Sequence, residues 1–295
     1  MKTNKTLIKG FSLIELSIVI LIIGILVAGV TTSSRLVRRV KITSAQGLTQ
    51  SAPVILIKDL AVWYESALDK SFIDSEESEG TPLTSWLDNN IQSTYKNDLK
   101  QLTVANQPKF SDGVINGLPS VRFDGVDDCF LSTAGISGNA MTLFLVGQRS
   151  AFTGGFQSGF AGLATSRGHW DDCLGGGSFI LFMDINSSIT SCTNVTTYYG
   201  TMPHPGNSIP FIYDIVMTGS NSNSFINGVS ASSNSGAYSY VFDVYRVGCA
   251  VNSGNNRGFY NGYISEIIVY TRALNTEERK SIESYLAKKY AIKIS

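Results

Sequence analysis

The sequence predicts an N-terminal transmembrane α-helix followed by an all-β jelly-roll sandwich that ends in a short helix. Three observations point to this fold class. A largely apolar run from Phe11 to Val30 has the length of a membrane helix. Short β-prone segments separated by Asn-Gly and Asp-Gly pairs fill the body of the chain, which is typical of sandwiches and jelly rolls. The last residues carry apolar side chains at helical spacing.

The predicted membrane helix has one acidic residue, Glu15, at its start. No other charged residue lies between Lys9 and Arg35. At about 1.5 Å per residue, a helix over residues 11–30 spans about 30 Å, the hydrocarbon thickness of a bilayer. A carboxylate inside such a span costs on the order of 2–3 kcal/mol or more, so we interpret Glu15 as a functional residue.

The residues Gly10-Phe11-Ser12-Leu13-Ile14-Glu15 and the apolar helix after them resemble the N-terminus of type IV pilins and type II secretion pseudopilins. The resemblance implies a leader of residues 1–10 in the cytoplasm, cleavage between Gly10 and Phe11 by a prepilin peptidase, and N-methylation of Phe11. It also implies that Glu15 acts in assembly. Its carboxylate would pair with the new α-amine of a neighbouring subunit in an apolar medium and so fix the register of stacking subunits.

Two other interpretations of this segment remain open. A secretory signal peptide also has a basic start and an apolar middle, but an acidic residue there is unusual and no clear A-x-A-like site follows Val30. A plain single-pass anchor explains the length of the run but not Glu15. Positive charges lie on both sides of the helix, so they do not decide its orientation.

The composition of the body is typical of a β-rich domain outside the cytoplasm. Charged residues make up 16% of the chain and the formal net charge is +0. Because the chain has no basic excess, we expect no nucleic-acid partner. The 295 residues leave room for one large domain or two small ones after the helix.

The four cysteines predict two disulfides formed in an oxidising compartment. Four cysteines allow three pairings. We favour Cys173–Cys192 as a local link and Cys129–Cys249 as a long-range link. A metal site is not favoured, because no C-x-x-C spacing occurs and only two histidines could join it.

The helix is expected to continue beyond the membrane toward Gln50, since Pro53 is a stop signal. Residues 11–52 are therefore the predicted assembly helix, with the membrane span at 11–30, and residues 53–295 are the predicted head. Within the head, residues 54–64 are expected to form a strand and residues 69–84 a surface loop.

The remaining β-structure is predicted from turn residues. The pairs Asn116-Gly117, Asn227-Gly228 and Asn261-Gly262 suit tight hairpins, because both residue types tolerate positive φ; Asp112-Gly113 and Asp124-Gly125 are further turn signals. The β-prone runs are 120–123, 141–147, 179–183, 211–217, 224–226, 241–247 and 263–270.

The last helix is predicted to start at Asn275-Thr276-Glu277-Glu278, which has the pattern of a capping box. Ile282, Tyr285, Leu286 and Tyr290 follow at helical spacing. This short amphipathic helix is expected to pack on the sandwich.

Blocks at both ends of the head resemble LamG-like jelly-roll domains of the concanavalin A-like class. The matching blocks are 60–67, Trp86-Leu87-Asp88, 116–128, 225–229 and 262–274. They occur in the family's order and cover both ends of residues 54–292, whereas residues 150–220 are generic. The class includes glycan-binding proteins and glycosidases, so the fold alone does not choose between binding and catalysis.

Catalytic patterns are not found, and we expect the chain not to be an enzyme. A retaining glycosidase needs two carboxyl groups about 5 Å apart, and the E-x-D-x-x-E pattern of concanavalin-like glucanases does not occur. No G-x-S-x-G motif supports a nucleophilic serine. The segment around Asp124, Asp127 and Asp128 is predicted to be a tight corner whose side chains bond backbone amides; a calcium site there is the less favoured alternative. No other cofactor is expected.

The segment Gly168–Cys173 is the most polar and aromatic cluster in the middle of the head. Trp170 could stack on a sugar ring while Asp171 and Asp172 accept hydrogen bonds from hydroxyls. The alternative, which we favour, is a surface loop anchored by a disulfide.

These features together predict a bacterial filament subunit of the type IV pilus kind, with a lectin-like head used in adhesion or glycan binding. Its expected partners are copies of itself or other pilins through the N-terminal helix, the prepilin peptidase, and surface glycans. It would lie in the inner membrane as a precursor and then in an extracellular or periplasmic filament. The alternatives are a type II secretion pseudopilin and a membrane-anchored carbohydrate-active protein.

Overall fold

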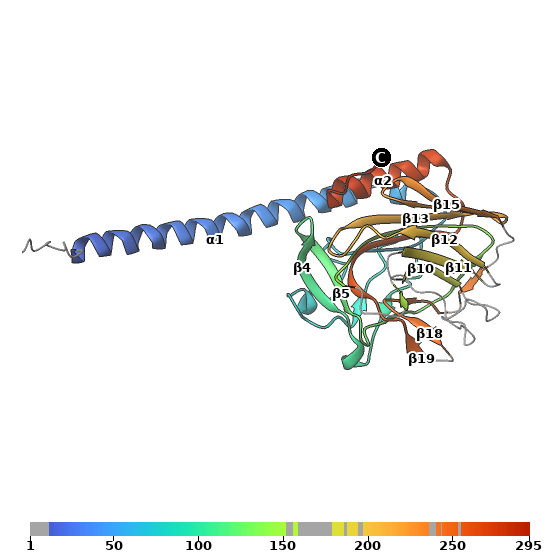
Figure 1. Ribbon diagram of the computed structural model, residues 1–295, viewed down its shortest axis with the longest axis horizontal. Helices are drawn as coiled ribbons and strands as arrows, with labels where there is room; N and C mark the ends of the chain where they lie inside the picture. The colour runs from blue at the N-terminus through green and yellow to red at the C-terminus, as the bar shows by residue number, and fades with distance from the viewer. Residues whose placement is uncertain are drawn as a thin grey trace, which may run out of the picture. The chain divides into compact units, whose positions relative to one another are not determined.

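The computed structural model describes residues 12–151, 156–158, 179–185, 188–193, 197–235, 240–242, 244–252 and 255–295. The chain divides into two compact units, Met1–Thr43 and Ser44–Ser295. The first contains most of helix α1; the second contains the end of α1, the described strands and helix α2 (Figure 1).

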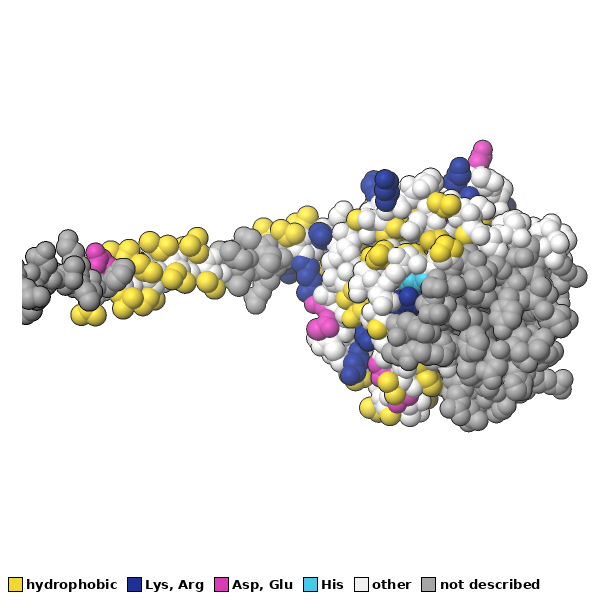
Figure 2. Space-filling view, viewed as in Figure 1, with side chains coloured by type: hydrophobic (Ala, Val, Ile, Leu, Met, Phe, Trp, Pro, Cys, Tyr) yellow, Lys and Arg dark blue, Asp and Glu magenta, His cyan; other side chains and the backbone are white. Residues whose placement is uncertain are grey.

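Helix α1 (Leu13–Gln50) runs without a break because its sequence contains no proline. Its large apolar side chains between Leu13 and Val27 are 45–85% exposed, and apolar side chains cover this part of the helix on the face seen in Figure 2. Among the described residues, no helix has the combination of length and hydropathy that crossing a membrane requires. The span expected at residues 11–30 therefore stays a prediction.

The end of α1 belongs to the second unit, where Ala45 and Thr49 are buried. The helix ends at Gln50, and Pro53 opens a short 3-10 helix, η1 (Pro53–Ile55). The prediction of a strand over residues 54–64 is wrong in its first half, because β1 begins only at Leu60. The 3-10 turn that follows Pro53, together with a positive φ of 66° at Asp59, keeps the backbone out of the extended conformation until that point.

Within the described residues, the largest sheet has eight strands. Seven follow the order β15-β14-β13-β8-β20-β5-β4, and β1 also pairs with β20. Their bounds are β1 (Leu60–Glu65), β4 (Lys109–Ile115), β5 (Leu118–Asp124), β8 (Met141–Arg149), β13 (Phe211–Met217), β14 (Asn221–Ile226), β15 (Val229–Ser235) and β20 (Asn261–Tyr270). One edge of β20 pairs with β8, and the other edge pairs first with β5 and then with β1.

Both faces of this sheet are buried. Val62, Tyr64 and Leu143 belong to the hydrophobic core on one face. Trp63 and Phe144, which alternate with them, are buried on the opposite face. The central strand β8 is buried at all nine of its positions, which explains why its sequence reads as an apolar run rather than as an alternation.

The smaller sheets complete the all-β sandwich. Among the described residues, one has the order β12-β11-β10-β9, one has the order β17-β6-β3-β2, and two are pairs, β16-β7 and β18-β19. Their bounds are β2 (Ser85–Trp86), β3 (Leu99–Lys100), β6 (Phe130–Ser132), β7 (Ile136–Gly138), β9 (Phe156–Ser158), β10 (Phe179–Ile185), β11 (Ser188–Thr193), β12 (Thr197–Pro203), β16 (Tyr240–Phe242), β17 (Arg246–Val247), β18 (Ala250–Asn252) and β19 (Asn255–Arg257). Two further 3-10 helices are η2 (Asp74–Glu76) and η3 (Val104–Asn106).

Two of the three Asn-Gly pairs form the predicted hairpin turns. Asn116-Gly117 joins β4 to β5 and Asn227-Gly228 joins β14 to β15, and all four residues have positive φ. Asn261-Gly262 is not a turn, because it forms the start of β20. Glycine is required there for a different reason: a Cβ on Gly262 would lie 2.5 Å from the carbonyl oxygen of Gln148.

Helix α2 (Thr276–Tyr290) starts with the predicted capping box. The Asn275 side chain accepts a hydrogen bond from the backbone N–H of Glu278, whose own side chain accepts one from the N–H of Asn275. The helix ends where Ala291 takes a left-handed conformation. Ile282, Tyr285, Leu286 and Tyr290 are buried, so the predicted apolar face does pack on the head.

A disulfide links Cys129, just before β6, to Cys249, just before β18. This is the long-range pairing that the sequence favoured. Its Cα atoms are 5.3 Å apart, an ordinary distance for a disulfide. Cys173 and the side chain of Cys192, the expected local pair, lie outside the described residues.

Candidate functional site

The start of α1 is held by a cap formed by Ser12 and Glu15. The Ser12 hydroxyl accepts a hydrogen bond from the N–H of Ile14 at 3.3 Å, and a Glu15 carboxylate oxygen accepts one from the N–H of Ser12 at 2.9 Å. These bonds satisfy N–H groups that have no partner within the helix, and they place a negative charge at its positive end. The Ser-x-x-Glu spacing is the sequence signal for this cap, which sequence analysis missed when it assigned Glu15 to assembly alone.

The carboxylate of Glu15 remains available to other partners. The residue is exposed, and its bond to Ser12 is local. An ammonium group makes a stronger hydrogen bond to a carboxylate than an amide N–H does, so it could replace this bond without unfolding the helix. Gly10 and Phe11, the expected cleavage site, lie outside the described residues.

The helix surface beyond Glu15 needs a covering partner. Its apolar side chains, from Leu13 to Val27, are exposed on every side. A contiguous apolar surface of this kind marks contact with a membrane or with other protein. The arrangement at this end of the chain is thus one exposed carboxylate followed by an apolar helix.

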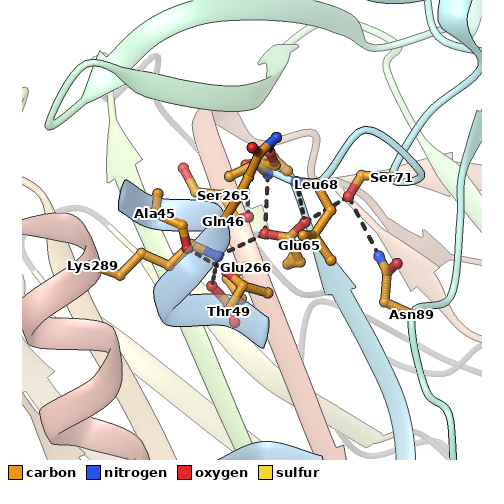
Figure 3. Close-up of polar contacts among 12 residues, drawn as sticks. Ala45, Gln46, Thr49, Glu65, Leu68, Ser71, Asn89, Ser265, Glu266 and Lys289 are labelled. Carbon is orange, nitrogen blue, oxygen red and sulfur yellow. Dashed lines mark hydrogen bonds and ion pairs between the residues drawn. The ribbon is translucent and has the colours of Figure 1, made fainter. Parts of the chain in front are cut away.

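The head contains a second arrangement of functional groups, a buried ion cluster between α2 and the main sheet (Figure 3). Lys289 Nζ lies 2.6 Å from a Glu65 oxygen and 2.8 Å from a Glu266 oxygen, and all three side chains are fully buried. Glu65 and Glu266 are direct partners across β1 and β20, where two like charges would repel each other without a cation. Burial alone would lower the pKa of Lys289, but the two carboxylates raise it well above its ordinary value.

Both carboxylates also accept hydrogen bonds from neutral donors. The donors to Glu65 are the N–H groups of Ala67 and Leu68 and the hydroxyl of Ser71, at 2.6–3.0 Å. The donors to Glu266 are the indole N–H of Trp63 and the hydroxyls of Tyr285 and Tyr290, at 2.8–2.9 Å. Burial raises the pKa of Glu65, but Lys289 and these hydrogen bonds outweigh it and the pKa lies below its ordinary value.

This geometry indicates a structural role, in which the ion pairs hold α2 against β1 and β20. It does not fit a pair of catalytic carboxylates. The carboxyl groups of a glycosidase must contact the substrate. Both carboxylates here are buried, and each already accepts hydrogen bonds from Lys289 and from three neutral donors. The cluster also holds the end of α1, because the Thr49 hydroxyl lies 3.3 Å from that of Tyr285. Nearby, the Gln46 amide donates to the carbonyl of Ala67 at 3.0 Å and to Asp69 at 2.7 Å.

A second buried cluster lies under the first turns of α2. Arg279 Nη1 lies 3.5 Å from an Asp214 oxygen and also bonds Glu283, and the guanidinium stacks 3.6 Å from the centre of the Phe225 ring. Burial and the charge of Glu283 raise the pKa of Asp214 well above its ordinary value, despite Arg279. One cation between two carboxylates thus occurs at both ends of α2.

The corner between Asp124 and Asp128 is a compact turn stabilised by its own side chains. Asp128 accepts a hydrogen bond from the N–H of Asp124 at 2.8 Å, and Asp124 accepts one from the N–H of Val126 at 2.7 Å. Burial raises the pKa of Asp128 to about 7. The carboxylate oxygens of Asp124, Asp127 and Asp128 lie within 4.8 Å of one another. These bonds are those of the predicted corner, and a calcium site there stays a prediction.

The predicted glycan contacts cannot be placed. Trp170, Asp171 and Asp172 lie outside the described residues.

Comparison with known protein families finds one match, at the start of the chain. Residues 6–31 match the family described as the prokaryotic N-terminal methylation motif. The match includes Gly10, Phe11 and Glu15 and ends within α1. A search of curated protein sequences finds no significant match.

Comparison with solved structures finds a similar fold in part of a sialidase. A Trypanosoma rangeli sialidase in complex with 2,3-difluoro-KDN aligns with 79% of this chain and 33% of its own, at 13% identity and a TM-score of 0.51. The same enzyme in complex with sialic acid aligns at 14% identity, 79% and 34% coverage and a TM-score of 0.51. Domain 4 of AbnA, an extracellular arabinanase from Geobacillus stearothermophilus, in complex with arabinotriose, aligns at 14% identity, 79% and 98% coverage and a TM-score of 0.47. The chain spans about a third of the length of the sialidases.

Proposed function

We propose that this chain is a subunit of a type IV pilus-like filament. The observation that carries the proposal is the match of residues 6–31 to the prokaryotic N-terminal methylation motif, followed by the exposed apolar surface of α1. A prepilin peptidase would cleave after Gly10 and Phe11 would be N-methylated. The precursor would be anchored in the bacterial inner membrane by residues 11–30, and the filament would lie outside the cell or in the periplasm.

Assembly would exchange one apolar environment for another. The apolar side chains of α1 would leave lipid and pack against the helices of other subunits, so their surface would stay out of water throughout. The carboxylate of Glu15 would exchange its bond with Ser12 for the charged α-amine of a neighbouring subunit, which also lacks water as a partner in that environment.

We propose a lectin-like, glycan-binding role in adhesion for the head. Support comes from the β-sandwich that it shares with a third of a sialidase solved with sialic acid, and from its LamG-like, jelly-roll sequence blocks. Trp170, Asp171 and Asp172 are the proposed contacts. No catalytic role is proposed, because the E-x-D-x-x-E pattern does not occur in the sequence and the cross-strand carboxylates Glu65 and Glu266 are buried around Lys289. Calcium at Asp124, Asp127 and Asp128 remains the less favoured alternative to a turn stabilised by its own side chains.

A type II secretion pseudopilin is the alternative with the same N-terminal chemistry. Its filament would be short and periplasmic, and its head would contact cargo or other pseudopilins. Long surface fibres would favour the pilus, and a secretion defect on deletion would favour the pseudopilus. Glycan turnover that is lost on mutation of Asp124 or Asp128 would instead favour a membrane-anchored carbohydrate-active protein.

The first experiment is to measure the intact mass and the N-terminal peptide mass of the protein recovered from cells. A chain that begins at methylated Phe11 supports the proposal. A chain that begins at Met1 would make it an ordinary anchored protein, and a start beyond Val30 would indicate a secretory signal.

A further inference from the structure

The ion cluster around Lys289 holds an amine against a carboxyl group in a buried site. Lys289 Nζ lies 2.6 Å from Oε2 of Glu65, so it lies no more than about 3.8 Å from the carbon of that carboxyl group. Oε2 of Glu266 lies 2.8 Å from the same nitrogen, and all three side chains are fully buried (Figure 3). Groups held close to an attacking geometry react with effective molarities of about 10⁵ M or more. The cluster thus contains a nucleophile, a carbon that it can attack, and an acceptor for protons.

One oxygen of Glu65 already has the partners of a reacting carbonyl. Oε1 accepts hydrogen bonds from the N–H of Leu68 at 2.6 Å and from the hydroxyl of Ser71 at 2.7 Å. Two donors placed in this way stabilise the negative charge that forms on a carbonyl oxygen during nucleophilic attack. Oε2 is the oxygen nearest the Lys289 nitrogen, and it is the one that can leave.

Glu266 has partners that do not depend on the charge of Lys289. Its Oε1 accepts hydrogen bonds from the indole N–H of Trp63 and the hydroxyl of Tyr285, and its Oε2 accepts one from the hydroxyl of Tyr290. These three neutral donors hold the carboxylate in position beside the Lys289 nitrogen. Glu266 can therefore take a proton from that nitrogen and give it up again without moving.

We propose that Lys289 and Glu65 form an intramolecular isopeptide bond, with Glu266 as the group that carries a proton between them. The ion cluster of the structure is the state before this reaction. One ammonium proton passes to Oε2 of Glu65, which leaves a neutral amine and a carboxylic acid. The nitrogen then attacks the carboxyl carbon of Glu65 and gives a second proton to Glu266. Glu266 returns this proton to Oε2, the C–O bond breaks, and one water leaves.

The reaction removes charges from a buried site. A desolvated ion pair becomes a neutral amide, so the cost of keeping two charges out of water disappears. The repulsion between the two cross-strand carboxylates disappears as well, because only Glu266 stays charged. The new carbonyl oxygen keeps Leu68 and Ser71 as donors. Because the two carboxylates raise the pKa of Lys289, the neutral amine is scarce, and we expect the bond to form slowly after folding.

The bond would join the first strand of the head to its last helix. Glu65 lies in β1 and Lys289 lies in α2, 224 residues apart in sequence. A covalent link across most of the head restricts the unfolded chain and so stabilises the folded head. In the proposed filament it would also limit how far a subunit can extend under tension, but the bond itself forms without any filament.

The intact mass of the purified full-length protein tests the bond directly. The protein is incubated until its mass is constant. After allowance for N-terminal processing and disulfides, we expect a mass lower than that of the sequence by one water. A succinimide at an Asp-Gly pair also loses one water, so tandem mass spectrometry of a tryptic digest must find a branched peptide that joins Glu65 to Lys289. Folded protein of full mass, or a lost water that maps elsewhere, would overturn the inference.

Glu266→Gln supplies the matched test of the proton carrier. An amide keeps an oxygen for Trp63 but cannot take and return a proton, so the yield of branched peptide at a fixed time should fall by about tenfold or more. Lys293→Met changes an exposed lysine of the same C-terminal segment and should leave the yield unchanged. Circular dichroism shows whether each variant has folded. Equal yields from folded Glu266→Gln and wild-type protein would remove Glu266 from the reaction, whereas the mass of the wild-type protein decides the bond without any variant.

Discussion

At the scale of single residues, the ammonium group of Lys289 neutralises two carboxylates that the strand register places opposite each other. Glu65 and Glu266 are cross-strand partners, and burial prevents water from screening their repulsion. The hydrogen bonds from Ser71, Trp63 and Tyr290 stabilise both anions but bring no positive charge. The contribution of the cluster to the stability of the folded head therefore depends on the positive charge of Lys289.

Lys289→Met is expected to lower the free energy of unfolding of the head by about 3–5 kcal/mol, because it leaves buried carboxylates without their cation. Urea unfolding of the full-length protein in detergent, followed by tryptophan fluorescence, measures the change. Lys293→Met is the control, since Lys293 is exposed on the same C-terminal segment. Equal effects of the two variants would show that the cluster does not stabilise the head.

The carboxyl group of Asp128 predicts a pH dependence of stability. Its pKa in the folded protein is about 7, above the ordinary value of 3.8, chiefly because of burial. The folded state thus binds the proton more tightly than the unfolded state does. The contribution of this group is complete below about pH 4 and is lost as the pH rises through about 7.

Between pH 4 and 8, the wild-type protein is therefore expected to lose stability relative to Asp128→Asn. The variant keeps an oxygen that can accept from the N–H of Asp124 but has no proton to lose. Urea midpoints measured across this range test the expectation, with Glu277→Gln as an exposed control. Parallel profiles for Asp128→Asn and the wild-type protein would contradict it.

At the scale of elements, local sequence predicted the structure where a local interaction decides it. The hairpins at Asn116-Gly117 and Asn227-Gly228 form as predicted, because such turns require only positive φ at both residues, which Asn and Gly tolerate. The prediction of a turn at Asn261-Gly262 was wrong. Glycine is needed there because the Gln148 carbonyl, on a neighbouring strand far away in sequence, leaves no room for a Cβ. The strand predicted from residue 54 failed because the 3-10 turn after Pro53 and the positive φ of Asp59 delay its start.

The N-terminal cap of α2 is expected to contribute about 1 kcal/mol to the stability of the head. Asn275→Ala removes the side-chain acceptor for the N–H of Glu278 and should lower the free energy of unfolding by that amount. Asn275→Asp keeps an acceptor and adds a negative charge at the positive end of the helix, so it should be close to neutral. If urea unfolding gives a lower free energy of unfolding for the aspartate variant than for the alanine variant, this account of the cap is wrong.

At the scale of the whole molecule, the sequence predicts Glu15 as a functional residue but gives no sign of the buried cluster around Lys289. Glu15 stands out because it is an isolated charge in an apolar run, which a reader of the sequence can see directly. The Lys289 cluster gives no such signal, because Lys289 and Glu65 are 224 residues apart and meet only after the sheet and α2 have packed. The predicted glycan contacts lie outside the described residues, so their prediction remains as it was.

Glu15 has two roles that a single substitution would confuse, the cap of α1 and the proposed pairing between subunits. Glu15→Ala removes both. It should leave membrane insertion intact, because the apolar run is unchanged, and it should strongly reduce filament yield, because the neighbouring α-amine loses its carboxylate. Membrane fractionation and the yield of filaments sheared from cells measure the two effects.

Ser12→Ala weakens the cap without changing Glu15, whose carboxylate can still accept from the backbone N–H of residue 12. It removes the hydroxyl that accepts from the N–H of Ile14 but keeps the carboxylate that would meet the α-amine. If pairing between subunits is the main role, Ser12→Ala retains most of the filament yield that Glu15→Ala loses. Equal losses in the two variants would mean that the helix cap, rather than pairing between subunits, limits filament yield. Normal filament yield from Glu15→Ala would remove its role in assembly altogether.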